Sequence, residues 1–490
     1  MTVSVFFVLV VKYIPAMKIR PIISFIAGIT IFSFLAGQGC TRAPDAAVTQ
    51  ASKHVELNVW AVIDDLDAYQ SIVNDYRALH PNVSVNYRRL RNEEYESELL
   101  NALAEDRGPD IFMIHNTWIG KYQPKILPMP LFTNVAVQTV VGTVKKEVTF
   151  QLATDRSISV KQYKNDYPEA VSKDTVRTIN VSTDPDKRQM EQRIMAVPVS
   201  VDTLAMYVNK DLLNTAGIPT VPSEWSAFQQ AIPKLVKQDS QGKLLQYGAG
   251  IGTGYNVERS PDILSVLMMQ NGSEMSAEDG TPTFGLIPSA LAGLRDRPPA
   301  YQALEFYTDF ANPGKEVYTW NKDQPNSLEA FLQGKSAFFF GYSYHLPTIR
   351  ARAPKLNLGI APLPQIEGNP TVNYANYWTW TVSKKTKSPD IAWNFLNFMI
   401  KPEEAKKYLD TAKRPAAIKS LLADQLEDED IGVFASQVLT AKSWYYGDDP
   451  GAMEDALEQL VENVIDGVEE IPTAVQNAVS KVSQTIRYSF

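Results

Sequence analysis

The chain has 490 residues, of which 44% are hydrophobic and 21% charged, and its formal net charge is −8. This length predicts more than one folding unit. The lack of a basic excess argues against non-specific nucleic-acid binding, which depends on Lys and Arg side chains that displace counterions. The single cysteine excludes an intrachain disulfide and a thiolate cluster for zinc or iron–sulfur.

Two apolar segments precede the single cysteine, Cys40. The first, residues 3–11, is too short to cross a bilayer as a helix. Read from Met17, the second has a short basic region, an apolar region over 21–36, and small or polar residues up to Cys40. That order is typical of an export signal. We therefore predict a signal region over 1–39, with the true start at Met17.

Cys40 resembles the lipidated cysteine of a bacterial lipoprotein, whose signal is cut just before a cysteine that carries diacylglycerol. Lipoproteins usually have a leucine and two small residues directly before the cysteine, whereas here Gln38 and Gly39 separate Leu35-Ala-Gly from Cys40. An ordinary signal peptide or an uncleaved anchor with an incidental cysteine is the alternative. Residues 40–53 are polar and lack periodicity, which predicts a flexible tether.

Short strands and helices alternate beyond the tether. Alternating apolar residues predict strands over 55–59 and 83–87. The helix between them is expected to end at His80, because Pro81 disfavours the helical conformation of the preceding residue. The apolar run 110–114 suits a buried parallel strand. Strands separated by helices predict an α/β fold, with a parallel sheet covered by helices on both faces.

The rest of the chain continues this pattern with one interruption. Residues 124–192 are expected to be loop and short helices, with a strand-like piece at 144–152. Further strands are predicted over 196–201, 203–208, 336–340 and 356–363, and helices over 224–237, 327–332, from Ser388 to Met399, 453–464 and 475–486.

No motif for catalysis or for metal or phosphate binding is complete. The four histidines are scattered without metal-ligand spacing. Gly334-Lys-Ser lacks the first glycine of a phosphate loop, and the glycines of 248–254 have the wrong spacing for a dinucleotide site. Gly341 to His345 lacks the second glycine of a nucleophile elbow. We therefore expect a protein that is not an enzyme and holds no metal or cofactor.

Aromatic and polar side chains gather where the predicted strands end. In open α/β sheets, ligands bind beyond the carboxyl ends of the strands. Aromatic rings stack on the apolar C–H face of a sugar, and Asp, Asn and Arg side chains hydrogen-bond its hydroxyls. The pattern favours a carbohydrate-like ligand over an ion. Any single aromatic residue can equally be a core residue, and we expect that role for Trp60, Trp225 and Trp393.

Several segments occur in a characteristic order. They are LNVW, HPNVSVNY, GPDIFMIHNTW, AVPVSVDTLAMYVNKDLLNTAGIP, QGKLLQYGAGIGTGYN, AFLQGKSAFFFGYSY, NLGIAPLPQIEG and PDIAWNFLNFMIKPEEAKKYL. Over about residues 55–490, this order resembles the extracellular solute-binding proteins of ABC importers, in the maltose-binding-like branch (family 1). The resemblance implies a two-lobe periplasmic-binding-protein-like fold of type II, with a ligand cleft between lobes joined by hinge segments. The expected lobes are 54–198 with 362–405, and 199–361 with 406–490.

The resemblance also implies ligand-binding residues at the strand ends of both lobes and at the crossings. They are Asp64, Asp65, Asn116, Trp118, Asp202, Tyr255, Asn256, Tyr344, Trp378, Arg414 and Trp444. Trp378 follows Ala375-Asn376, where the family usually has glycines. Asp64 and Asp65 can equally cap the next helix.

We therefore expect a monomeric, exported lipoprotein on the outer face of the cytoplasmic membrane. It would capture a sugar or oligosaccharide and deliver it to an ABC permease, because a ligand that touches both lobes shifts the population toward a closed form. One alternative is the same fold with another polar solute, such as a peptide, polyamine or phosphodiester. The other is an exported enzyme or a surface adhesion protein. No nucleic-acid partner is expected.

Overall fold

The computed structural model describes residues 46–142, 146–182, 184 and 186–486. The predicted signal region, its start at Met17 and the predicted lipid site at Cys40 lie outside these residues. Within the described residues, no helix combines the length and the apolar character that a membrane crossing requires.

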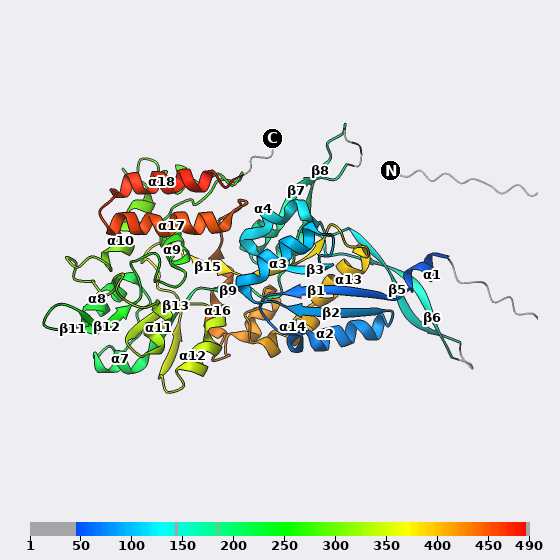
Figure 1. Ribbon diagram of the computed structural model, residues 1–490, viewed down its shortest axis with the longest axis horizontal. Helices are drawn as coiled ribbons and strands as arrows, with labels where there is room; N and C mark the ends of the chain where they lie inside the picture. Colours follow the sequence, from blue (N-terminus) through cyan, green and yellow to red (C-terminus); the bar gives the residue numbers. More distant parts are fainter. Residues whose placement is uncertain (1–45, 143–145, 183, 185, 487–490) are drawn as a thin grey trace, which may run out of the picture. The chain divides into compact units, whose positions relative to one another are not determined.

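The first large sheet has the strand order β2-β1-β3-β16-β4 (Figure 1). Its strands are β1 (Val55–Ala61), β2 (Val83–Arg89), β3 (Ile111–His115), β4 (Ile126–Leu127) and β16 (Trp378–Ser383). β1 runs parallel to β2 and β3, as the sequence predicts, whereas β16 runs antiparallel to β3 and β4. The α/β class is therefore confirmed. The antiparallel strand β16 comes from a segment late in the chain.

Alternate residues of these strands enter different cores, because successive side chains of a strand point to opposite faces of its sheet. Ile111 and Met113 pack with α2 (Leu66–Leu79), α13 (Pro389–Met399) and α14 (Pro402–Ala412). Phe112 and Ile114 pack with α3 (Asn92–Ala104) on the other face. Two predicted helix ends agree with the structure. His80 is the C-cap residue directly after α2. Ser388 directly precedes α13, whose first residue is a proline. We call this sheet with its helices the first lobe.

The second large sheet has the order β11-β12-β13-β10-β14. Its strands are β10 (Ala205–Asn209), β11 (Lys237–Gln238), β12 (Leu244–Ala249), β13 (Ser336–Gly341) and β14 (Leu358–Ala361). Phe338 and Phe340 of β13 face a large core, and Phe339 faces a smaller one. We call this sheet with its helices the second lobe.

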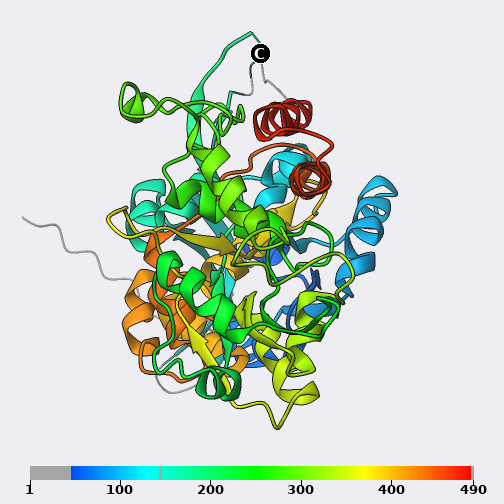
Figure 2. The same ribbon diagram turned by 90° about the vertical axis from the view of Figure 1, so that its left-hand side faces the viewer.

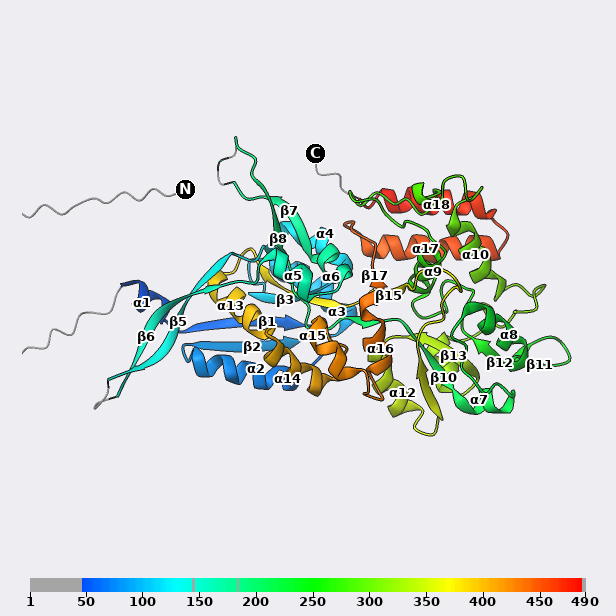
Figure 3. The same cartoon turned by 180° about the vertical axis from the view of Figure 1, so that it is seen from behind.

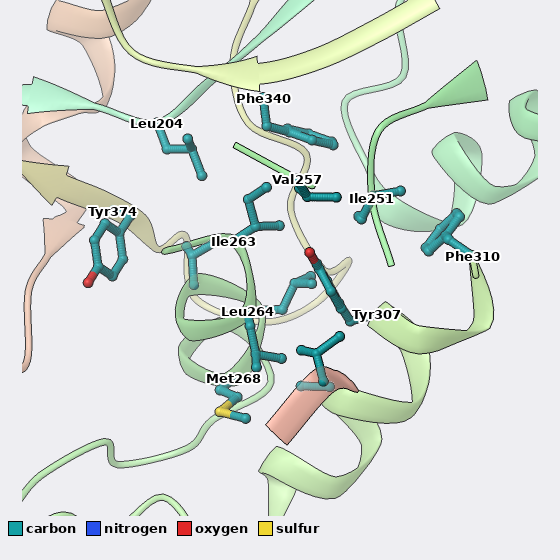
Figure 4. Packing of buried hydrophobic residues seen from close by; sticks show 14 of the residues in the cluster. Leu204, Ile251, Val257, Ile263, Leu264, Met268, Tyr307, Phe310, Phe340 and Tyr374 are labelled. Atoms are coloured by element: carbon teal, nitrogen blue, oxygen red, sulfur yellow. The ribbon is translucent and has the colours of Figure 1, made fainter. Parts of the chain in front are cut away.

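Among the described residues, seven helices contribute to the large core of the second lobe. They are α7 (Lys210–Thr215), α8 (Trp225–Leu235), α9 (Ser260–Gln270), α10 (Pro299–Asp309), α11 (Ser327–Leu332), α17 (Pro450–Ile465) and α18 (Ile471–Ser483). Figure 4 shows Ile263, Leu264 and Met268 of α9 packed close to Tyr307 of α10. α17 and α18 lie side by side, and Figure 2 shows them as a red pair. They are the two amphipathic helices that the sequence predicts near the end of the chain.

A three-stranded sheet, β17-β15-β9, gathers the segments where the chain passes from one lobe to the other. These strands are β9 (Asp202–Thr203), β15 (Asn373–Asn376) and β17 (Ala441–Lys442). In β15, Tyr374 belongs to the core of the second lobe and Ala375 to that of the first. Ala441 of β17 belongs to the core of the first lobe, and Trp444, two residues after β17, belongs to that of the second. The crossing segments that the resemblance implies are therefore adjacent strands.

The packing differs from the expected lobe limits at two places. Leu363 and Val372 lie in the core of the second lobe, although 362–405 was expected in the first. Ile418 and Val438 lie in the core of the first lobe, although 406–490 was expected in the second. A strand or helix carries no sequence signal for which core it joins, so the limits follow from packing alone.

The irregular region 124–192 contains more regular structure than the sequence predicts. Its hairpins are β5 (Phe132–Val141) with β6 (Glu147–Arg156), and β7 (Val176–Asn180) with β8 (Met190–Ile194). Between them lie two short helices, as expected: α5 (Val160–Asp166) and α6 (Glu169–Thr175). Of the strand-like piece at 144–152, residues 147–152 belong to β6 of the first hairpin. Its partner strand was missed because cross-strand pairing is not encoded locally.

The expected tether 40–53 is partly helical. Residues Ala46–Ala51 form α1, which contacts β5 and β6. Figure 3 shows α1 beside the cyan hairpin. The prediction of a wholly flexible tether is therefore wrong for these six residues. Alanine favours helix intrinsically, and the hairpin supplies a packing surface that the sequence pattern does not reveal.

Candidate functional site

Two tryptophans lie together at the end of the first sheet. Trp118 ends the turn that follows β3, and Trp378 begins β16, the antiparallel neighbour of β3. Their rings are 5.2 Å apart at 72°, and Trp118 also stacks on Tyr122. Both tryptophans are only half-buried. The structure thus brings together two predicted site residues and leaves part of each indole accessible.

His115 adds a polar group beside this pair. Its ring lies 5.5 Å from that of Trp378, and its Nε2 lies 3.1 Å from Oδ1 of Asn376. Burial, together with a smaller effect of the positive charge of Arg259, lowers the pKa of His115 to about 4, although the bond to Asn376 and the charge of Asp262 oppose the shift. The imidazole is therefore neutral at pH 7. Because Oδ1 of Asn376 accepts, Nε2 carries the proton.

Arg259 brings a charge of the second lobe to the same place. Its guanidinium donates to Asp262 at 2.8 and 2.9 Å and to Glu454 at 2.8 Å. Its φ of 56° is uncommon for a residue with a side chain. Two carboxylates on two helices hold this conformation, and strained positions of this kind concentrate at functional sites. The charge of Arg259, in the second lobe, also contributes to lowering the pKa of His115, in the first.

Tyr344 presents a ring from the second lobe. It follows β13, stacks on Tyr342 at 5.5 Å and 17°, and is 38% exposed. The hydroxyl of Tyr342 donates to Asp262, the carboxylate that also binds Arg259. Tyr344 therefore rests on a fixed neighbour while one side stays open, as an aromatic stacking surface requires.

Asp64 and Arg414 form an ion pair with a separation of 3.0 Å. Asp64 also accepts from the hydroxyl of Tyr408 at 2.7 Å, and its charge contributes to raising the pKa of Arg414. Asp65 is exposed, pairs with Arg89, and makes no side-chain capping bond to α2. The structure thus joins two predicted site residues, Asp64 and Arg414, to each other.

Asp202 lies on the first crossing strand and binds the second lobe. Its carboxylate accepts from the backbone N–H of Ser343 at 3.1 Å and from the hydroxyl of Ser343 at 2.6 Å. Burial raises the pKa of Asp202, against the opposing effect of the Ser343 hydroxyl. Asp202 therefore fixes the loop that carries Tyr344.

Asp174 forms a junction that the sequence did not reveal. Its carboxylate accepts from Asn116 at 3.0 Å, from the hydroxyl of Tyr377 at 2.6 Å and from the hydroxyl of Ser443 at 2.6 Å. Burial raises its pKa, and the three donors and Arg177 lower it in part. Asp174 thus ties the irregular region to the ends of β3, β15 and β17. It lies in a segment without periodicity, so no pattern could have indicated it.

Three predicted residues lie apart from these groups. Trp444 is 4% exposed, and its indole donates to Ser265 inside the core of the second lobe. The amide of Asn256 is bonded to Thr253, Trp320, Asn321 and Gln324. Tyr255 is 64% exposed and makes no aromatic contact among the described residues. A ligand role for these three stays a prediction.

Arg259 is a residue that sequence reasoning could have found. It follows Asn256 by three positions in the same strand-end segment. Extending the predicted strand-end site to the start of the next helix would have included it. His115 directly precedes the predicted Asn116, and it was set aside because it lacks metal spacing.

A cavity of about 740 Å³ lies elsewhere in the first lobe. It is lined by Arg156, Ser157, Asn394, Asn397 and Lys401, among others, and by none of the predicted site residues. No group of three or more potential metal ligands occurs in the described part of the chain.

The raised pKa of Glu458, on α17 near Arg259, predicts a pH dependence of stability that can be measured. Burial, together with the negative charges of Glu454 and Asp455, raises this pKa to about 7. An unfolded glutamate loses its proton near pH 4.3. Between these values the folded chain holds more protons than the unfolded chain, so stability falls as the pH rises. We expect Glu458→Gln to stabilise the protein by about 1 kcal/mol at pH 8, a value reduced for solvent screening because the side chain is partly exposed.

Urea unfolding at pH 5 and pH 8 measures this effect. The difference between Glu458→Gln and the unmodified chain should be larger at pH 8. The exposed Glu427→Gln serves as control. An equal effect of Glu458→Gln at both pH values would contradict the assignment.

The comparisons with known proteins identify the family. The model of the bacterial extracellular solute-binding protein family matches residues 60–406. The chain belongs to this family. Maltodextrin-binding protein MdxE of Bacillus subtilis is 24% identical over 314 residues, which cover 61% of this chain and 69% of that protein. A galactooligosaccharide-binding protein of the same organism is 23% identical, over 52% of this chain and 56% of that protein.

Solved structures of this solute-binding family share the two-lobe fold. A cyclo/maltodextrin-binding protein in complex with maltotetraose has a TM-score of 0.64 at 17% identity, covering 89% of this chain and 98% of that one. The sugar-binding protein MalE of Xanthomonas citri has a TM-score of 0.63 at 17% identity, with 88% and 97% covered. The predicted fold class, with two maltose-binding-like lobes, is therefore confirmed.

Proposed function

We propose that this solute-binding protein captures a sugar or oligosaccharide outside the cell and delivers it to an ABC permease, without catalysing a reaction. The observation that carries the proposal is the pair Trp118 and Trp378, which is half-buried at the end of the first sheet. Tyr344 and Arg259 of the second lobe complement it. The names of the relatives, which include maltodextrin- and galactooligosaccharide-binding proteins, support the same class of ligand.

These residues match the two kinds of surface that a sugar ring offers. The indoles and the Tyr344 ring stack on its apolar C–H faces. Arg259 donates to its hydroxyls, and His115 with Asn376 adds polar atoms next to Trp378. Similar binding sites in proteins combine aromatic walls with a few placed polar groups. A ligand held in this way contacts both lobes, and it favours the closed arrangement by its differential affinity.

The crossing strands suit this motion. β9, β15 and β17 are short, and they are the connections that change cores within a few residues. Hinges of domain closure are a few residues at element ends that absorb the change in backbone angles. We place the hinge at these three strands.

Replacing Trp118 with alanine should weaken saccharide binding at least about tenfold, which corresponds to about 1.4 kcal/mol. The thermal midpoint without ligand should change little, since the indole is already half-exposed. A thermal-shift screen with maltooligosaccharides, galactooligosaccharides, peptides and spermidine identifies the ligand, and calorimetry gives its affinity. Tyr301→Ala, on α10 of the second lobe, is the matched control.

The screen also separates the alternatives. Stabilisation by a peptide or by spermidine alone would keep the fold and replace the sugar with another polar solute. No response to any saccharide would refute the carbohydrate assignment.

The anchor is a second part of the proposal: Cys40 carries lipid and holds the protein on the outer face of the cytoplasmic membrane. Cys40→Ser should move the protein from the membrane fraction to the soluble fraction. Mass spectrometry of the mature N-terminus checks the lipid directly. An unmodified thiol, or an N-terminus other than residue 40, would refute the anchor and leave the ligand assignment untouched.

A further inference from the structure

The β5–β6 hairpin is a two-stranded arm fixed at one end. Its strands pair in register from Phe132 opposite Arg156 to Val141 opposite Glu147, and neither pairs with any other strand in the described part of the chain. At its base, the amide of Asn394 on α13 donates to Thr133 at 3.0 Å and to Asp155 at 2.9 Å.

One face of the distal half is apolar. Residues directly opposite each other, and alternate residues of one strand, share a face. Val140 lies opposite Val148, so these two share a face with Phe150 and Leu152. Val140 is 59% exposed and Val148 64%; Leu152 is exposed and Phe150 half-buried. We call these four residues the apolar stripe. Gln138, opposite Phe150, is the polar residue on this face. The opposite face is mixed: Thr139, Thr149, Gln151 and Glu147 lie there together with Val137 and the exposed Val141.

The chain places this arm near its own anchor point. α1 contacts both strands of the hairpin and begins at Ala46. Five residues separate Ala46 from Cys40, and even a fully extended segment between these two residues spans at most about 20 Å. If Cys40 carries lipid, the membrane surface therefore lies within that reach of α1, and hence near the arm.

We propose that the apolar stripe of the β5–β6 hairpin rests on the outer surface of the lipid bilayer. The inference rests on the anchor proposed above and adds a second point of contact. A tether of five residues keeps the protein near the membrane without orienting it, whereas the arm is fixed to the first lobe by Asn394. Contact at both points restricts how the protein turns relative to the membrane.

The structure sets the depth of this contact. The outer edges of a two-stranded hairpin leave backbone N–H and C=O groups without strand partners. Such groups are costly in the hydrocarbon core, so the arm stays at the interface, where water and headgroups satisfy them. A second copy of the chain is a poorer occupant, because four side chains fall short of the about 800 Å² per partner that a stable interface buries.

A fluorescent probe on the stripe tests the proposal. In a chain that begins at residue 40 and carries Cys40→Ser, Val148→Cys supplies the one thiol. A hexahistidine tag before residue 40 tethers the protein to phosphatidylcholine and phosphatidylglycerol vesicles that contain a nickel-chelating lipid. We expect the emission of a polarity-sensitive label at residue 148 to shift to shorter wavelength and to be quenched by spin-labelled lipid. The same label at Leu294→Cys, where leucine is 78% exposed, should show neither change.

A third labelled protein assigns the effect to the stripe. With the label at Leu152→Cys, the substitutions Val140→Asn and Val148→Asn should abolish the shift. Equal emission with and without vesicles at residue 148 would overturn the proposal. A shift that appears without vesicles and grows with protein concentration would also overturn it, in favour of a second copy. Because the tag supplies the tether, these outcomes do not depend on whether Cys40 is natively lipidated.

Discussion

Replacing Trp444 with alanine is expected to lower the free energy of unfolding by about 3–5 kcal/mol, the usual cost of removing a buried tryptophan. The indole is 4% exposed, and its rings lie 5.9 Å from those of Phe284 and Tyr445. Its N–H donates to Ser265 at 3.1 Å, so truncation also leaves that hydroxyl without this donor. Urea unfolding followed by circular dichroism measures the loss.

Trp118→Ala is the variant to compare with Trp444→Ala. Both tryptophans were predicted to bind ligand, yet one indole lies inside a core and the other is half-exposed at a strand end. We expect Trp444→Ala to change mainly stability and Trp118→Ala mainly affinity. If Trp444→Ala left the unfolding curve in place but abolished saccharide binding, the packing role would be refuted and the predicted ligand role supported.

Replacing Asp174 with alanine is expected to cost about 3 kcal/mol or more, because two buried donors and one half-buried donor lose an acceptor, and each unsatisfied buried group costs about 1–3 kcal/mol. These donors are the side chains of Asn116, Tyr377 and Ser443. They belong to segments that follow β3, β15 and β17, so the loss loosens the region where the lobes join. Asp174→Asn keeps the shape and one carbonyl acceptor, and should cost about half as much.

Chemical denaturation of both variants measures these losses, and Asp166→Ala on α5 of the same irregular region is the control. An Asp174→Ala protein as stable as the unmodified chain would show that water replaces the carboxylate without loss. The thermal midpoint with saturating saccharide gives a second readout, since a loosened junction should also reduce the stabilisation that ligand provides.

The ion pair of Asp64 with Arg414 shows how tertiary contacts reassign predicted site residues. Both were expected to contact ligand from opposite sides, yet they bond to each other at 3.0 Å within the segments that pack on the first sheet. The carboxylate of Asp202 likewise accepts hydrogen bonds from Ser343. Sequence position indicated that Asp64 follows the first strand and that Asp202 lies at the first crossing, and both positions agree with the structure. Arg414, expected to close from the second lobe, instead follows α14. Which partner each of them binds depends on residues hundreds of positions away.

The sequence by itself determined the α/β class and the helices and strands with strong periodicity, because these depend on side chains a few positions apart. The strand ends after β3 and β13 were predictable for the same reason, and with them Trp118 and Tyr344. Only the tertiary structure decided that Trp118 meets Trp378, that Trp444 is enclosed in a core, and that Asp174 joins the crossing segments. Those contacts link residues between about 60 and 270 positions apart. No local pattern specifies which distant partner a buried surface or a hydrogen-bonding group will find.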